Sequence, residues 1–252
     1  RYDHLKTQRD NWNSHYQELA DYMLPRKADV VKSRSKGDKR MELIFDGTAL
    51  QAVDLLSSSL HGLLTSGAAP WFHLDMKEED LGREDDVREW LQDTSQRMLR
   101  AFDQSNFGTE VHEMYVDLVV FGTGCMFVEM EEDALRFSTR HISEFYIQEN
   151  QFGMVDTVFR SYKSPVRQVV QRFGIENVTD YILKKHQDKP DEEIEILHVV
   201  IPREDRDKTK VDNKNMPFAS IYIDMQSSAM LSESGFQEFP YIVPRYLKAT
   251  GE

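Results

Sequence analysis

Residues 44–74 read IFDGTALQAVDLLSSSLHGLLTSGAAPWFHL. We predict that this stretch forms a buried helix, a sharp stop and an aromatic anchor. Asp46 and Thr48 favour a helix start, because their side-chain oxygens accept hydrogen bonds from free backbone N–H groups. The branched apolar residues that follow recur at spacings of three and four, which places them on one helix face. They are Leu50, Val53, Leu56, Leu60, Leu63 and Leu64.

The same stretch also carries its own stop signal. Gly67 can adopt the left-handed conformation that ends a helix, and Pro70 prevents the helix from resuming. Trp71, Phe72 and Leu74 follow at once and are too apolar for a loose loop. We therefore expect Pro70, Trp71 and Phe72 to be structural anchors that open a strand packed on the helix.

Helical patterns come before strand patterns along the chain, which is typical of an α+β fold. An amphipathic first helix contains a further anchor, Trp12, and ends at Pro25. Apolar periodicity predicts three more helices, at 48–66, 87–102 and 111–119. We expect a mainly helical part over residues 1–124 and a β-rich part, mixed or antiparallel with short helices, over residues 125–252.

The β-rich part follows a change of period after Gly124. Alternating segments predict strands, some in hairpins, and Pro165 is well placed to open a short helix, with another around Ile182. Residues 76–86 and 203–216 are predicted loops, and residues 239–246 are predicted to be an extended segment at a sheet edge. The predicted strands are 125–130, 135–139, 145–148, 155–162, 194–201, 218–225 and 229–232.

The composition is 40% hydrophobic and 30% charged over 252 residues, with a net charge of −13. No apolar run approaches the roughly 20 residues that span a membrane. Residues 26–40 hold seven Lys or Arg against two Asp, a net charge of +5, which leaves −18 on the rest. A body this acidic is a poor high-affinity binder of nucleic acid, which needs Lys and Arg to displace counterions. It suits a surface past which DNA slides.

Two patterns invite a catalytic interpretation. Cys125, the single cysteine, could act as a nucleophile only with a base in hydrogen-bond reach. It opens an apolar strand, so a buried inert thiol is the better interpretation. Gly122 and Gly124 could cradle a phosphate, but phosphate loops run from strand into helix, whereas this pair follows a helix. We predict a helix cap and a turn, and no catalytic or cofactor-binding residues.

Metal and contact sites give weaker signals. The eight histidines lack metal-ligand spacing, and the acidic residues of 78–86 lack the alternating carboxylates of a calcium loop, so we predict no metal site. Lys32, Arg34 and Lys36 alternate with small residues in the basic loop. These three residues are candidates for contact with DNA or with another protein, and a solvated loop is an equal alternative.

Several motifs, taken in their order and spacing, resemble the bacteriophage head-to-tail connecting proteins, which are the portal proteins of short-tailed phages. The resemblance runs from about residue 12 to the end of the chain. It rests on D-G-T before the leucine-rich helix, L-L-T-S and P-W-F-x-L after it, and on further landmarks. These are Trp12, Tyr16, Leu19, Tyr22, Pro25, Ser105–Phe107, Phe121–Gly124, His198–Arg203, Phe239–Tyr241, Arg245–Tyr246 and Gly251–Glu252.

The resemblance implies a structural virion protein, not an enzyme. Portal subunits form a ring, a dodecamer, at one capsid vertex. In such a ring, Lys32, Arg34 and Lys36 would be candidates for contact with a neighbouring subunit or capsid. Double-stranded DNA is packaged and ejected through the ring without sequence-specific binding, and the partners are terminase, capsid and tail or adaptor proteins. The protein would lie in the virion, and in the host cytoplasm during assembly, with no membrane contact.

Within that family this chain would be largely the portal wing. A chain that starts at Arg1 and ends at Glu252 is expected to be a fragment, with the stem and clip beyond residue 252. Two alternatives stay open: a different structural or adaptor protein of the virion, and a hydrolase with an unrecognised site.

Overall fold

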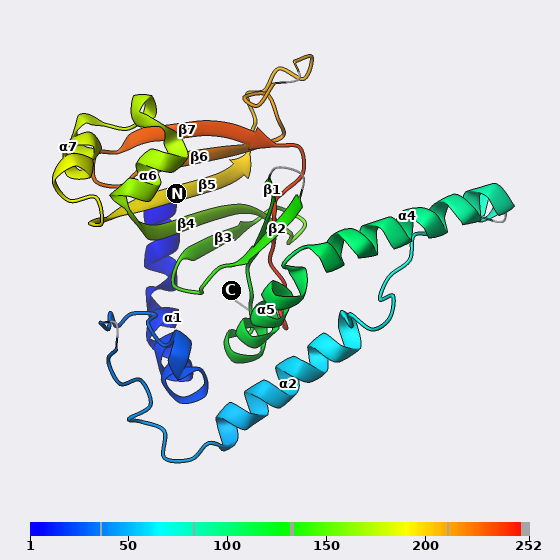
Figure 1. Cartoon of the computed structure of the whole chain (residues 1–252), viewed down its shortest axis with the longest axis horizontal. Helices are drawn as coiled ribbons and strands as arrows, with labels where there is room; N and C mark the ends of the chain where they lie inside the picture. The colour runs from blue at the N-terminus through cyan, green and yellow to red at the C-terminus, as the bar shows by residue number, and fades with distance from the viewer. Residues whose placement is uncertain (36, 83, 132–133, 211, 248–252) are drawn as a thin grey trace. The chain divides into compact units, whose positions relative to one another are not determined.

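The computed structural model describes residues 1–35, 37–82, 84–131, 134–210 and 212–247 (Figure 1). The chain forms two compact units. One combines Arg1–Trp12 with Ser143–Pro240, and the other combines Asn13–Ile142 with the segment that begins at Tyr241. The first helix, α1 (Tyr2–Met23), therefore contributes to both. The sequence suggested, from a change of period, a boundary at residue 124, and each unit combines segments from both sides of that position.

The Ser143–Pro240 unit is built on a five-stranded antiparallel sheet in the order β3-β4-β5-β6-β7. Each strand neighbours the next in sequence, so the sheet is a meander. Three short helices follow β4: α6 (Val166–Phe173), η2 (Ile175–Asn177) and α7 (Asp180–Asp188) (Figure 1). The strands are β3 (Phe145–Glu149), β4 (Val155–Pro165), β5 (Glu193–Pro202), β6 (Phe218–Asp224) and β7 (Ala229–Phe236).

Both faces of this sheet carry apolar side chains, because alternate residues of a strand point to opposite faces. On one face, Ile194 and Ile196 of β5 pack with the buried side of α6, which includes Val166 and Val169. On the other, Leu197 and neighbouring residues pack with the first turns of α1. This two-sided burial explains why β5 reads as an almost continuous apolar run.

The second unit has a three-stranded antiparallel sheet in the order β2-β1-β8. Its helical part begins with the second half of α1 and the short η1 (Pro25–Lys27). The other helices are α2 (Thr48–Leu64), α3 (Glu79–Gly82), α4 (Asp85–Gln104) and α5 (Phe107–Phe121). The strands are β1 (Met126–Glu131), β2 (Ala134–Thr139) and β8 (Tyr241–Ile242).

The core of this unit surrounds α5. Val111, Met114 and Tyr115 of α5 pack with Met126 of β1 and Phe137 of β2. The helix ends at Gly122, which has φ 75° in the left-handed region that favours glycine. A Cβ on Gly124 would lie 2.8 Å from Met114 Cγ, so the chain can turn there only without a side chain. The predicted helix cap and turn is confirmed.

Most predicted elements are confirmed, including the hairpin of β1 and β2, the buried face of α6 and the edge position of β8. Residues 203–216 contain no helix or strand among those described. Two predictions of secondary structure are wrong. Residues 76–86 contain α3 and the start of α4, because acidic residues suit the first turn of a helix. Residues 71–74 form no strand, since they make no ladder with another segment.

The α2 helix lies at the predicted position but is not the buried helix that we expected. Only Val53 and Ser57 are buried in it, and Leu56 and Leu63 are exposed. Periodicity identifies an apolar face without showing what covers it. The helix also begins differently: Asp46 Oδ1 accepts a hydrogen bond from the Thr48 N–H at 2.8 Å, as predicted, but Gly47 is the cap position. Gly67 is not among the glycines with positive φ.

The predicted anchor, Trp71, is part of an aromatic cluster. Its ring stacks on Phe107, with centroids 5.7 Å apart and planes 11° apart, and also meets Phe102 and Phe72. These ring contacts join Trp71 to α4 and α5, whereas we had expected packing on α2. Pro70 is exposed beside it.

We expect Trp71→Ala to lower the free energy of unfolding by about 2–4 kcal/mol, somewhat below the cost for a fully buried aromatic residue because the Trp71 side chain is 36% exposed. Chemical unfolding followed by circular dichroism measures the change. Trp90→Ala is the matched control, because Trp90 is 62% exposed and its loss should change stability by under about 0.5 kcal/mol. Equal effects of the two substitutions would contradict an anchoring role for Trp71.

Candidate functional site: the basic loop and its helical support

The basic loop, residues 26–40, is tied to the second half of α1 by one glutamine. Gln17 is buried, and its Oε1 accepts hydrogen bonds from the backbone N–H groups of Val30, Val31 and Lys32 at 3.3, 2.8 and 3.0 Å. Its Nε2 donates to Asp21 Oδ1 at 3.0 Å. A segment without regular structure thus has its free donors satisfied by a helix side chain.

Asp21 holds two cations of the loop. Its carboxylate lies 2.7 Å from Lys32 Nζ and 2.8 Å from Arg34 Nη2. Burial alone would raise the pKa of Asp21, but hydrogen bonds and charge from Lys32 and Arg34 outweigh burial and lower it. The carboxylate is therefore ionised at neutral pH and neutralises part of the loop.

A second carboxylate, Asp29, lies within the loop itself. It accepts from Arg34 Nη1 at 3.1 Å and from Arg40 Nη1 at 2.6 Å. Burial opposes ionisation here too, yet Arg40 and Arg34 lower the pKa of Asp29. Arg34 therefore bridges two carboxylates, Asp21 and Asp29, and its own pKa is raised, first by the hydrogen bond to Asp21.

Lys27 joins the start of the loop to α5. Its Nζ lies 3.2 Å from both Asp117 Oδ1 and Glu113 Oε2. Asp117 is buried, and desolvation raises its pKa despite the opposing effect of the Lys27 charge. His141 Nε2 lies 2.7 Å from the Lys27 backbone oxygen. A buried carboxylate needs such a partner, because an unpaired charge in the interior is costly.

The predicted contact residues therefore have unequal positions. The Arg34 side chain is mostly enclosed by its own chain, whereas the Lys32 side chain is 54% exposed beyond its pair with Asp21. Lys36 lies outside the described residues. Trp12, the remaining predicted anchor, is 38% exposed on α1, so it is not a buried anchor.

Sequence reasoning found the loop but missed its support: Gln17, Asp21 and Asp117. The first two are separated by four residues, which puts them on one side of α1. That spacing is common on solvated helices, so it does not predict that Gln17 and Asp21 contact the basic loop.

The candidate reaction centres have other roles. Cys125 is buried, as predicted for an inert thiol. Among the described residues no three His, Cys, Asp or Glu side chains form a group that could hold a metal ion.

A small open pocket of about 150 Å³ is lined by Gly67, Pro70, Trp71 and neighbours. It is well below the roughly 300–1,000 Å³ of ligand sites. No described helix has the length and apolar composition of a membrane span.

A pair of histidines lies where α2 meets α5. The rings of His61 and His112 have centroids 5.6 Å apart, and the ring of Tyr115 lies 6.3 Å from that of His61. Burial, and then the neighbouring His112, lower the pKa of His61. The neutral form of His61 is thus favoured in the folded state.

This depressed pKa gives a pH dependence with a definite sign. The unfolded chain binds a proton at His61 more readily than the folded chain, so His61 stabilises less as pH falls below about 6.5. We expect the free energy of unfolding to fall between pH about 7.5 and 5.5, and to fall less in His61→Gln. The measurement is denaturant unfolding at each pH.

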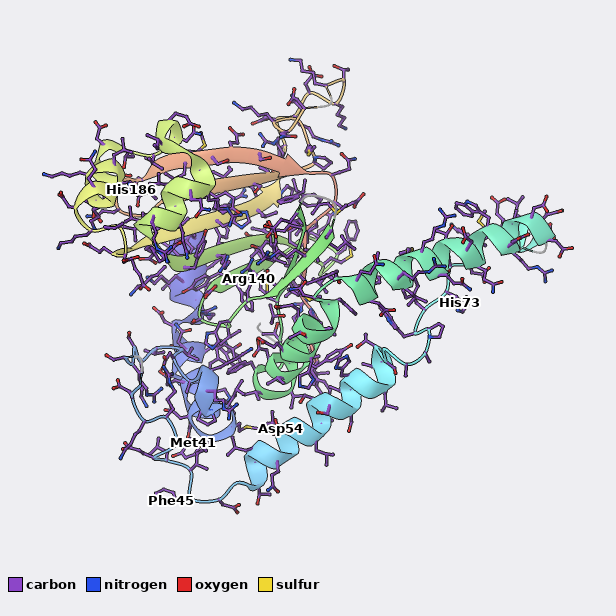
Figure 2. All side chains as sticks on the ribbon, in the orientation of Figure 1. Met41, Phe45, Asp54, His73, Arg140 and His186 are labelled. Carbon is purple, nitrogen blue, oxygen red and sulfur yellow. The ribbon has the colours of Figure 1, made fainter. Side chains whose placement is uncertain are left out.

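His73→Gln is the matched control, because His73 lies in the connection after α2 (Figure 2). His73→Gln leaves the pair of His61 and His112 intact, so this variant should keep the fall in the free energy of unfolding between pH about 7.5 and 5.5. A His61→Gln variant with an unchanged pH slope would show that the histidine pair does not affect stability.

These features define an α+β protein with a clamped, positively charged loop and exposed helix faces, which are suited to contacts with other macromolecules. The chain belongs to the bacteriophage head to tail connecting protein family, whose pattern it matches over residues 1–252. It is 35% identical over 247 residues to the portal protein of Salmonella phage epsilon15. It is 32% identical over 257 residues to the probable portal protein of Bordetella phage BPP-1.

The two alignments cover 96% and 100% of this chain. They cover only 44% and 46% of the respective relatives, so the chain spans less than half the length of the portal proteins that it matches. The family is structural, as the resemblance implied.

Proposed function

We propose that this chain is the wing portion of a portal subunit, and that the protein forms a ring at one capsid vertex through which double-stranded DNA is packaged and ejected. The observation that carries the proposal is the family match over the entire chain, with two portal proteins above 30% identity. A dodecameric ring, capsid attachment, and docking of terminase and of tail or adaptor proteins belong to the same proposal. The protein then lies in the virion, after assembly in the host cytoplasm.

The charge distribution supports a conduit for DNA. All of the acidic excess lies outside the basic loop, and acidic surfaces repel phosphate. Inside the loop, four basic side chains form ion pairs with carboxylates of the same chain. They are Lys27, Lys32, Arg34 and Arg40. Few cations remain to displace DNA counterions, so passage without strong binding is the expected behaviour.

Ring formation is the first test. The full-length protein should elute from gel filtration with the mass of a closed oligomer by light scattering, and negative-stain images should show rings with a central hole. A strict monomer at every concentration would contradict the portal proposal. An adaptor protein, the main alternative, would associate with a preformed ring without forming one by itself.

We further propose that the basic loop contacts an acidic surface of the neighbouring subunit. The expected partners are the acidic stretches 78–86 and 129–133, of which residues 83 and 132–133 lie outside the described residues. Opposite charges at such a contact set the register of association more than its affinity. Contact with capsid or DNA is the alternative.

We expect the double substitution Lys32→Gln and Lys36→Gln to weaken ring assembly severalfold, because each exposed ion pair contributes about 0–1 kcal/mol. Assembly of the wild type should also weaken as salt rises. Arg34→Gln distinguishes the role of the loop in the fold from its role in assembly. Arg34 pairs with Asp21 and Asp29, so its loss should lower the stability of the subunit. Normal assembly of the double variant at low and high salt would exclude the contact with a neighbouring subunit.

A further inference from the structure

The α2 helix carries a second apolar side that the described residues of this chain leave uncovered. Leu55, Leu56 and Leu63 are 72%, 49% and 82% exposed. At 3.6 residues per turn they share one side of the helix with the small residues Ser59 and Gly62. We call these five residues the α2 leucine face.

The opposite side of α2 already has a partner. Val53 and Ser57 are buried, and Leu60 packs with the core around α5. An apolar helix face is normally covered by another part of the protein or by a partner. No described residue of this chain covers the α2 leucine face, so it is a surface open to a partner.

The chemistry of this face restricts the partner. Asp54 (Figure 2) is the one acidic or basic residue of α2 other than His61, so the helix offers no Lys or Arg to phosphate. Nucleic acid is thereby a poor partner. Exposed leucines instead fit an apolar protein surface.

The same unit exposes such a surface on another helix. Trp90 and Met98 of α4 are 62% and 39% exposed, and half-buried Val87 lies on the same side. We call these three residues the α4 tryptophan face. At the C-terminal end of α4, the ring of Phe102 packs against Phe107 of α5. The N-terminal end of α4 extends away from α5 (Figure 1).

Two unlike apolar faces on one chain are what a ring requires. A contact of one face with itself in a second copy closes at a dimer, whereas a ring repeats a contact between two different faces. We propose that the α2 leucine face of one copy packs against the α4 tryptophan face of the next copy. This inference rests on the proposed ring and names the surfaces that close it.

Cross-linking tests the pairing directly. Leu56→Cys and Trp90→Cys are introduced together into the full-length protein and treated with a short bismaleimide. Cys125 is fully buried, so it is not expected to react, and the wild-type protein treated in parallel gives the background from any other native cysteine. The double variant should give a ladder of covalent oligomers beyond the dimer, and each single variant should give none.

A disruption experiment supplies the second measurement. Leu56→Asp combined with Leu63→Asp should weaken assembly at least tenfold, while the circular dichroism melt of the unassembled protein stays unchanged, because both side chains are exposed. Phe152→Asp is the control, since Phe152 is 75% exposed in the turn between β3 and β4. Assembly of this control should equal that of the wild type.

The outcomes separate the two proposals. A strict monomer contradicts both the ring and the pairing. Rings in which the double cysteine variant gives no ladder, or in which Leu56→Cys alone gives dimers, contradict the pairing and leave the ring standing. Normal assembly of the double aspartate variant also overturns the pairing. A contact of this kind should persist at high salt, unlike one made by the basic loop.

Discussion

Burial of α5 is the constraint on which the Asn13–Ile142 unit depends. Val111, Met114 and Tyr115 are covered by the sheet of β1 and β2 and by α2, and Phe107 at its first turn meets the aromatic cluster of Trp71 and Phe102. Its polar side is not free either, because buried Asp117 requires Lys27 and so fixes the start of the basic loop. One helix thus determines where two other helices, a hairpin and a loop can lie.

This dependence explains which parts of the fold could be predicted from sequence. The order of helices and strands follows from local period, so α5, α6 and the β1–β2 hairpin were recognisable. Turn chemistry identified Gly122, because a left-handed cap suits glycine. The division into two units was not recognisable. It depends on α1 being shared and on Tyr241 returning to β1, and both are contacts between residues far apart in sequence.

The candidate site was predictable only in outline. Seven basic residues within 26–40 identify the loop, but nothing local shows that Asp21 takes Lys32 and Arg34, or that Gln17 satisfies three N–H groups. The same limit applies to α2. Its leucines at spacings of three and four predict an apolar face, and the α-helical period cannot tell a face covered by the same chain from one that needs another copy.

The internal pairing of the loop also changes the balance of forces in assembly. A net charge of +5 on residues 26–40 suggests a free positive arm beside an acidic body. Four of its cations are already held by carboxylates of the same chain, so much of their Coulomb energy stabilises the monomer. Exposed pairs between copies would add little in water and salt. The exposed leucine and tryptophan side chains differ, because the free energy of burying them is gained only when a partner covers them. Association of copies should therefore draw its free energy chiefly from apolar helix faces, with charge restricting their register.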